Sequence, residues 1–340
     1  MSEQKPYIGG QAVLEGVMMR SPKCLTVAVR RPDGTIALRE GPFRSRFARP
    51  PWKWLGFRGV ATLVESLGMG FGALRFSAEQ QMTAEEREGA QDAGKWAMVL
   101  STVLALGLFV ALPQLLAAGS GELLGWELAV QDSGFHLVIG GFKLLVLLGY
   151  LMAISRVPEI RRVFQYHGAE HKTINAQEQG LPLTVDHVRA QTTLHPRCGT
   201  TFLVVVVVVS ILVGSVATPL LLPNVDGALG QALTLLLRIA LLPVIAAVSF
   251  ELQRFGARFC TRGPLQVFLW PGYLFQKITT REPTDDQMEI AIAAMQAAEW
   301  REAVGDDVPA DDEPLLFPTF ASFTEALPAL RSAPVPAAAE

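Results

Sequence analysis

Long apolar stretches dominate the middle of the chain. Four of them contain the roughly 20 apolar residues that a helix needs to cross the hydrocarbon core of a bilayer: Trp96–Ala118, Phe135–Ser155, Thr201–Leu222 and Ala228–Phe250. Half of all residues are apolar and only 18% are charged, against about 25% in soluble globular domains. The pattern predicts an α-helical integral membrane protein with four transmembrane helices. It excludes an ordinary soluble enzyme, a disordered chain and a disulfide scaffold.

The basic residues are distributed on one side only. The connection from Gly119 to Gly134 contains acidic residues but no Lys or Arg, and the turn Pro223–Gly227 contains only Asp226. The connection between the second and third stretches is rich in Arg and Lys, as is the segment before the first. The positive-inside rule therefore predicts that both termini and the central loop are cytoplasmic.

Shorter patterns predict structure outside the four stretches. Cys24–Val29 and Thr35–Glu40 are strand-like and are joined by a turn containing Asp33-Gly34, which predicts a β-hairpin. Val60–Ala78 is apolar but contains two charged residues, so we expect an amphipathic helix on the cytoplasmic interface, with a re-entrant segment as the alternative. Leu265–Ile278 predicts a second interfacial piece, and Thr284–Ala303 predicts a helix capped by Thr284.

These elements divide the chain into seven segments. They are a cytoplasmic N-terminal region with the β-hairpin (1–55), an interfacial helix and linker (56–95), transmembrane helices 1 and 2 (96–155), a cytoplasmic loop (156–200), transmembrane helices 3 and 4 (201–252), a cytoplasmic and interfacial C-terminal region (253–304) and a flexible tail (305–340). The tail is expected to be flexible because it is rich in Pro, Ala and acidic residues.

The sharpest chemical motif lies in the central loop. It reads H-G-A-E-H and follows Pro158, which suits the first turn of a helix. His167 and His171 are four residues apart, so on a helix both imidazoles lie on one face and can bind one metal ion. Glu170 is turned by about 100° from His171 and is assigned as general base rather than ligand. The spelling H-x-x-E-H is that of the inverted zinc-protease motif; the alternative is two solvated histidines on a polar helix.

A second motif, H-P-R-C-G-T at His195–Thr200, directly precedes the third apolar stretch. Both His and Cys bind zinc, and this motif is predicted at the same membrane face as the first. We expect Cys198 or His195 to supply a further ligand to a divalent metal, with zinc favoured by the soft N and S donors. The alternative is a plain loop in which Arg197 anchors the helix to lipid headgroups.

Further charged residues are weaker candidates for a site. Glu15, in the glycine-rich run Gly9–Arg20, would reach the metal as ligand or base, or lie in a turn before the hairpin. Glu251, at the cytoplasmic end of the fourth stretch, is a similar carboxylate. Arg238 lies near the middle of that stretch, and no stretch contains an acid to pair with it, so it is predicted to face the bundle interior. Lys143 is expected to extend toward the membrane surface.

Together these motifs resemble the YqhQ-like bacterial membrane family, a family of unknown function described as a predicted metal-dependent enzyme. The resemblance covers Tyr7 to Met295 and rests on the runs Gly9–Arg20, His167–Asn175 and His195–Thr200. It implies a multi-pass protein of the bacterial cytoplasmic (inner) membrane and suggests a metal, but it supplies no substrate. The family usually has Tyr at the position of Phe250. Because this chain has Phe there, a tyrosine side chain at that position cannot be essential here.

Two classes of function follow. The first is a metal-dependent enzyme, hydrolase-like, whose site lies at the cytoplasmic membrane face. Membrane lipids are expected as partners, with a membrane-embedded or lipid-linked substrate, no nucleic acid, and a homo-oligomer left open. The alternative is a non-enzymatic membrane scaffold, assembly factor or transporter component with a structural metal site. Glu170 separates the two, because a structural site is closed and needs no adjacent base.

Overall fold

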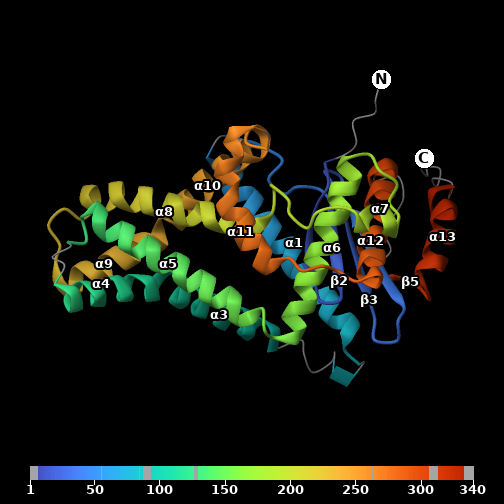
Figure 1. Cartoon of the computed structure of the whole chain (residues 1–340), viewed down its shortest axis with the longest axis horizontal. Helices are drawn as coiled ribbons and strands as arrows, with labels where there is room; N and C mark the ends of the chain where they lie inside the picture. Colours follow the sequence, from blue (N-terminus) through green and yellow to red (C-terminus); the bar gives the residue numbers. More distant parts are fainter. Residues whose placement is uncertain are drawn as a thin grey trace.

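A computed structural model of the chain describes residues 7–54, 56–83, 85–86, 93–125, 129–261, 263–305 and 313–332. Long helices form a bundle at one end of the molecule, and a small β-sheet with its own covering helices forms the other end (Figure 1). The two ends meet where the bundle helices lead into α6 (Pro158–Glu178).

The bundle contains the apolar stretches predicted from the sequence. Among the described residues, three helical segments are long and apolar enough to cross a membrane, namely Val99–Leu124, Ser133–Ile154 and Gly199–Leu221. The first of these includes part of α3 (Ala93–Leu106), a π-helical turn η1 (Gly107–Ala111) and α4 (Leu112–Leu124); the others are α5 (Ser133–Ile154) and α8 (Gly199–Leu221). This part of the fold class is confirmed.

The fourth apolar stretch differs from the continuous helix predicted over Ala228–Phe250. It forms α9 (Gly227–Ala240) and α10 (Leu242–Phe259), which are bent by 50° at the break between them. Pro243 lies in the first turn of α10. Because proline lacks an N–H and its ring clashes with the carbonyl four residues earlier, it interrupts a helix at this point. The pair counts as a fourth spanning element only when both helices are taken together.

The sheet of the described chain has five antiparallel strands in the order β1-β2-β3-β4-β5. Their bounds are Gly9–Val13, Gly16–Arg20, Cys24–Arg30, Ile36–Pro42 and Leu315–Phe317. The predicted hairpin is confirmed as the pair β3 and β4, in register from Cys24↔Pro42 to Arg30↔Ile36. The glycine-rich run before it forms a second hairpin, β1–β2, with Glu15 in its turn.

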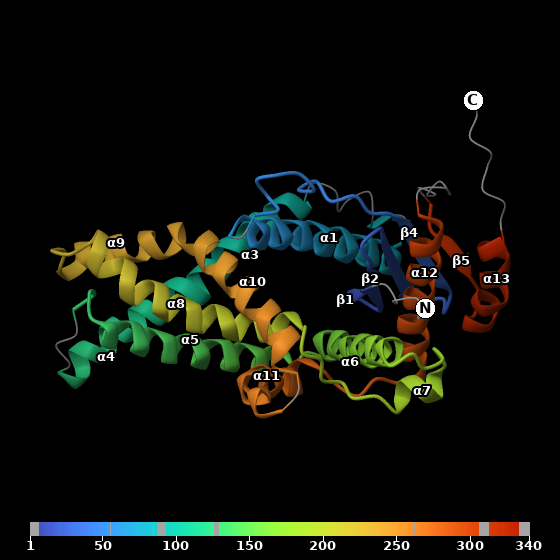
Figure 2. The same cartoon turned by 90° about the horizontal axis from the view of Figure 1, so that it is seen from above.

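The two faces of the sheet are covered by different helices (Figure 2). One face packs against α6 and α12 (Asp285–Val304), and the other packs against the second half of α1 (Phe57–Gln81) through Ala73 and Phe76. Helix α12 has a capping box at Thr284, as its sequence predicts, and most of its surface is buried. The first half of α1 runs along α10, where Gly59 lies so close to Ala247 that a Cβ atom would not fit.

The chain after Gly305 was expected to be flexible throughout, but residues 313–332 form structure. Strand β5 adds to the free edge of β4, with Ile36↔Phe317 and Leu38↔Leu315 in register. Helix α13 (Phe320–Ser332) follows, and the Phe323 ring is fully buried against Phe317. Aromatic and aliphatic residues in this Pro-rich segment thus supply the burial that a flexible tail lacks.

An ion pair in the core of the sheet end provides a test of this packing. Arg301 of α12 is fully buried, and its Nε lies 2.8 Å from Oε2 of Glu40, which is itself nearly buried on β4. Glu40→Gln should lower the free energy of unfolding by about 3–5 kcal/mol, because it leaves a buried cation without its counter-charge. The measurement is the thermal unfolding midpoint of the protein in mild detergent.

The matched control is Glu289→Gln, which removes the partner of Arg30 from a partly exposed pair. Exposed pairs contribute only about 0–1 kcal/mol, so this variant should unfold close to the wild-type midpoint. Equal midpoints for the two variants would contradict the assignment of Glu40 as the essential counter-charge.

Candidate metal centre

Helix α6 supplies two of the three side chains that form the candidate centre. It begins at Pro158 with Glu159 in its first turn, as expected for a helix start, and runs for 21 residues between the sheet and the bundle. His167 and His171 lie one turn apart on the same face, with ring centroids 4.4 Å apart. The predicted i, i+4 arrangement is therefore present.

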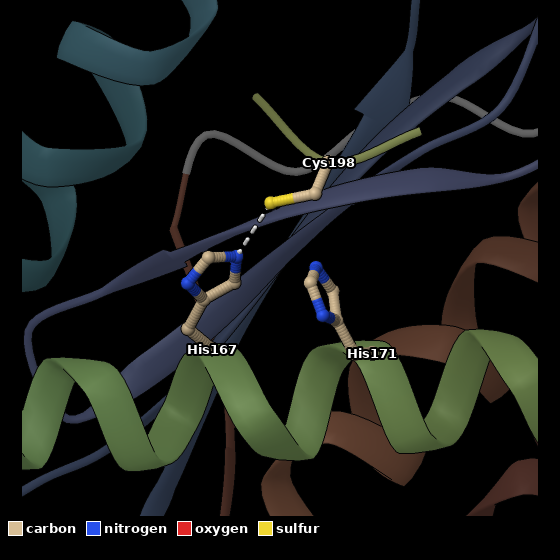
Figure 3. A group of neighbouring side chains, drawn as sticks. All are labelled: His167, His171 and Cys198. Carbon is tan, nitrogen blue, oxygen red and sulfur yellow. Dashed lines mark hydrogen bonds between the residues drawn. The ribbon is translucent and has the colours of Figure 1, made fainter. Parts of the chain in front are cut away.

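The third side chain is Cys198, which comes from the start of α8 and points at the two imidazoles (Figure 3). Its Sγ lies 3.3 Å from Nε2 of His167. The three candidate ligand atoms, one each from His167, His171 and Cys198, all lie within 4.8 Å of one another. Cys198 also caps α8, since its Sγ accepts the backbone N–H of Thr200.

Backbone carbonyls fix the orientation of both histidines. Nδ1 of His167 lies 2.8 Å from the carbonyl oxygen of Thr279, and Nδ1 of His171 lies 2.5 Å from that of Thr193. A carbonyl oxygen can only accept, so each Nδ1 carries the proton and each Nε2 presents a lone pair, which in His167 faces the Cys198 thiol. Metal-binding histidines characteristically donate the other ring N–H in this way, which fixes the tautomer and the ring orientation.

Burial favours the neutral form that binds a metal. His171 is almost completely buried, and this burial lowers its pKa below the ordinary value for histidine. Two neutral imidazoles and one thiol form a donor set suited to zinc. Within the described part of the chain, no fourth His, Cys, Asp or Glu joins this group. Three protein ligands with a fourth position free is the arrangement of catalytic rather than structural zinc sites.

His195, the other proposed ligand, lies beside the group and not in it. Its ring centroid is 5.6 Å from that of His171, and its Nε2 is 3.7 Å from a carboxylate oxygen of Glu178. The side chain of Gln276 holds the backbone on both sides, accepting from the N–H of His195 and donating to its carbonyl. The sequence left open whether Cys198 or His195 is the further ligand. The structure places Cys198, and not His195, in the group with the two histidines.

Glu170 lies next to the group, on the side of α6 that faces the sheet. Its Cγ and Oε1 pack so closely against Gly10 of β1 that a Cβ atom there would come within 2.9 Å. No described residue donates a hydrogen bond to its carboxylate, and burial raises its pKa to about 7, opposed by the nearby His167. A carboxyl with such a pKa can both accept and donate a proton near neutral pH.

The remaining sequence candidates lie elsewhere. Glu15 accepts hydrogen bonds from Nε and Nη2 of Arg162, near the start of α6. Glu251 does the same with Arg58 and thereby joins α10 to α1. Both carboxylates thus form ion pairs that link distant segments and do not point into the His–Cys group. Arg238 is buried within the bundle, where its Nη2 donates to Nδ1 of His136 at 2.7 Å.

Gly168 is a position of the candidate centre that sequence reasoning missed. A Cβ atom at Gly168 would lie 2.0 Å from the carbonyl oxygen of Arg281, so only glycine lets this segment cross α6. The same segment carries the Thr279 carbonyl that orients His167. A glycine inside a helix costs about 0.5–1 kcal/mol relative to alanine, so its position between the two histidines was the available signal.

The fold and the site define a class: a helix-rich protein with spanning-length apolar helices and a His₂Cys group, partly buried at His167 and buried at the other two residues, at one end of the bundle. Residues 55–300 match the family model described as "Protein of unknown function (DUF1385)", and the chain belongs to this family. It is 34% identical over 313 residues to "Uncharacterized protein YqhQ" of Bacillus subtilis (strain 168), covering 86% of this chain and 92% of that protein. No solved structure matches the chain. The predicted family is therefore confirmed.

The close passage at Gly168 predicts a loss of metal affinity when it is blocked. Gly168→Ala should push the 279–283 segment away from α6 and disturb the carbonyl that orients His167. Changes to such outer partners typically cost about 10- to 100-fold in metal affinity, which can be measured by competition with a chromogenic chelator. Gly72→Ala is the control, because Gly72 lies in α1 with open space at its Cβ position; a similar loss in both variants would contradict this role.

Proposed function

We propose that this protein is a metal-dependent enzyme, hydrolase-like, acting at the cytoplasmic face of the membrane. The observation that carries the proposal is the convergence of His167 Nε2, His171 Nε2 and Cys198 Sγ, with both Nδ1 atoms already held by backbone carbonyls. Such prior orientation is characteristic of metal ligands and is not needed for solvated histidines. Zinc is the metal that this donor set favours.

In this proposal, different residues of the chain bind the metal and transfer the proton. His167, His171 and Cys198 would hold the ion and leave a position for water or substrate. A bound divalent metal supplies Lewis acidity and lowers the pKa of bound water. Glu170 is proposed as the general base: its carboxyl is buried beside His167, and in the described chain no other residue neutralises it.

Exposed apolar side chains support the membrane location. On α1, Val64, Leu67 and Phe71 are about half exposed and follow helical spacing along one face. The segment after α10 forms the 3-10 helix η2 (Pro264–Leu269) and α11 (Trp270–Thr279), where Phe268 and Trp270 are also exposed. Water would not stabilise these faces, whereas lipid at an interface would. We propose membrane lipids as partners and a lipid-linked or membrane-embedded substrate.

A structural metal site in a membrane scaffold is the second candidate. It is favoured by one observation, which is that the Glu170 carboxyl packs against Gly10 of β1 rather than between the two histidines. In that case the metal would tie α6 to α8, and its coordination would be closed by a fourth ligand.

Metal content and coordination distinguish these functions. We expect about one zinc per chain after purification under reducing conditions. His167→Ala, His171→Ala and Cys198→Ser should each release it, while Glu170→Gln, a change in the same helix, should retain it. X-ray absorption at the zinc edge should report two imidazole nitrogens, one sulfur and one oxygen from water.

A fourth protein ligand in place of that oxygen would contradict the enzymatic proposal and support the scaffold. Retention of metal in all three ligand variants would contradict the site itself.

Topology is tested independently of the metal. Reporter domains fused after Gly125, at the end of α4, should be active outside the cytoplasm. Fusions after Gln179, at the end of α6, should be active inside, because basic residues lie within α6 and on both sides of it. The reverse pattern would place the His₂Cys group in the other compartment and contradict the proposed location.

A further inference from the structure

A cavity of about 280 Å³ lies inside the helical bundle, and its lining includes none of His167, His171 and Cys198. It is bounded by η1, α5, α8 and the break between α9 and α10, and its walls are almost entirely apolar. Two positive side chains, Lys143 and Arg238, also line it. Small-molecule sites usually have volumes of about 300–1,000 Å³, so the cavity is close to the lower end of that range.

The two cations lie at the same depth of the bundle. Helices α5 and α9 begin at the same end, because Gln131 just before α5 donates to the carbonyls of Leu222 and Val225 in the turn that precedes α9. Lys143 lies about 15 Å and Arg238 about 17 Å along its helix from that end, at 1.5 Å per residue. Both positions are near the middle of a hydrocarbon core about 30 Å thick.

Neither cation has an acidic partner among the residues that the structure describes. Lys143 points inward and donates to Oγ of Ser210 at 2.9 Å, instead of extending to the surface as the sequence suggested. Arg238 is 5% exposed and donates to His136, while its Nε has no hydrogen-bond partner in the described part of the chain. Unpaired positive charge at this depth is costly and typically marks a functional site.

The backbone around the cavity is irregular at two points. Phe109 and Val110 of the π-helical turn and Leu241 and Leu242 of the helix break all contribute to its walls. Single π-helical turns and broken membrane helices both occur frequently at ligand sites. Gly214 also lies at the cavity and makes room for the His136 ring that orients Arg238.

The cavity has a polar end and an apolar end. From the cations, the lining continues along α5, α8 and α10 through Leu151, Leu203 and Ile245 toward the α6 end of the bundle, and these side chains are apolar. A ligand that fits must therefore place negative charge beside Lys143 and Arg238 and a hydrocarbon chain between the leucines. A simple inorganic anion would leave the apolar part unfilled, and a neutral lipid would leave the charges unmatched.

We propose that this cavity binds a single-chain anionic amphiphile, with its carboxylate or phosphate between Lys143 and Arg238 and its chain directed toward α6. The site goes beyond the proposed metal chemistry. It rests only on the location of the bundle in a bilayer, and it requires no metal.

The test is competition with a fluorescent fatty acid bound to the full-length protein in an uncharged detergent. The competitors share a ten-carbon chain and differ in the head: decanoate, decyl phosphate, decanol and decyltrimethylammonium. Decanoate or decyl phosphate should compete at least 10-fold more strongly than decanol, and decyltrimethylammonium should not compete. The stronger of the first two identifies the head that the site prefers.

Variants connect the binding to the two cations. Lys143→Met and Arg238→Gln should each weaken decanoate binding at least 10-fold, and Arg238→Lys should restore part of the affinity. Lys277→Met is the matched control, because Lys277 is an exposed cation on α11 outside this cavity, and it should bind as the wild type does. If Arg238→Gln does not fold, Lys143→Met decides the test, because within the described chain Lys143 bonds to one serine hydroxyl and its loss disturbs less of the fold.

Two results would overturn the proposal: equal competition by decanol and decanoate, or unchanged affinity in Lys143→Met. Zinc content measured on the same preparations separates this result from the metal proposal. His167→Ala should lose zinc and still bind decanoate, whereas Lys143→Met should keep zinc and lose decanoate.

Discussion

The crossing of α6 by the 279–283 segment is the contact on which the candidate metal centre depends. The backbone N–H of Arg281 donates to the carbonyl of Phe164 at 2.8 Å, and the Arg281 carbonyl lies directly over Gly168. This places the Thr279 carbonyl against His167 Nδ1. The same segment connects α11 of the bundle end to α12 of the sheet end. One close passage therefore joins the two halves of the molecule and also orients the candidate ligand His167.

A second constraint fixes the opposite wall of the centre. Gln276, fully buried on α11, bonds to both backbone groups of His195 and also donates to the Thr201 hydroxyl of α8. Its side chain therefore holds the loop that leads into α8 at both ends, with Cys198 between them. A buried amide with this many partners permits few alternative arrangements. The hydrogen bonds of Gln276 therefore account for the position of Cys198 opposite α6. They also account for the position of His195 beside Glu178 rather than in the His–Cys group.

The sequence predicts features that depend on local spacing and fails where partners are distant. The i, i+4 histidines, the hairpin at β3–β4 and the apolar helices all follow from periodicity and turn residues, and the structure contains them. The partners of Glu15 and Glu251 are 147 and 193 residues away along the chain, so no local pattern identified them. The choice between His195 and Cys198 depended on Gln276, which belongs to another helix. The break at Leu241 had a visible signal in Pro243, but the apolar composition of the stretch predicts one continuous helix. Strand β5 had a signal in a cluster of apolar residues, but the Pro, Ala and acidic residues around it predict a flexible tail.

The buried charges of this chain differ in whether an acidic side chain lies beside them. Arg301 is fully buried but has Glu40 beside it, so its charge is neutralised within the fold and serves packing. Lys143 and Arg238 have only neutral partners in the described chain, which leaves their charge available to a ligand. Helix α8 connects the two polar regions: Cys198 caps its start, and Ser210, which holds Lys143, lies about 18 Å further along at 1.5 Å per residue. A rigid helix of this length lets both regions form on one scaffold, separated along its axis.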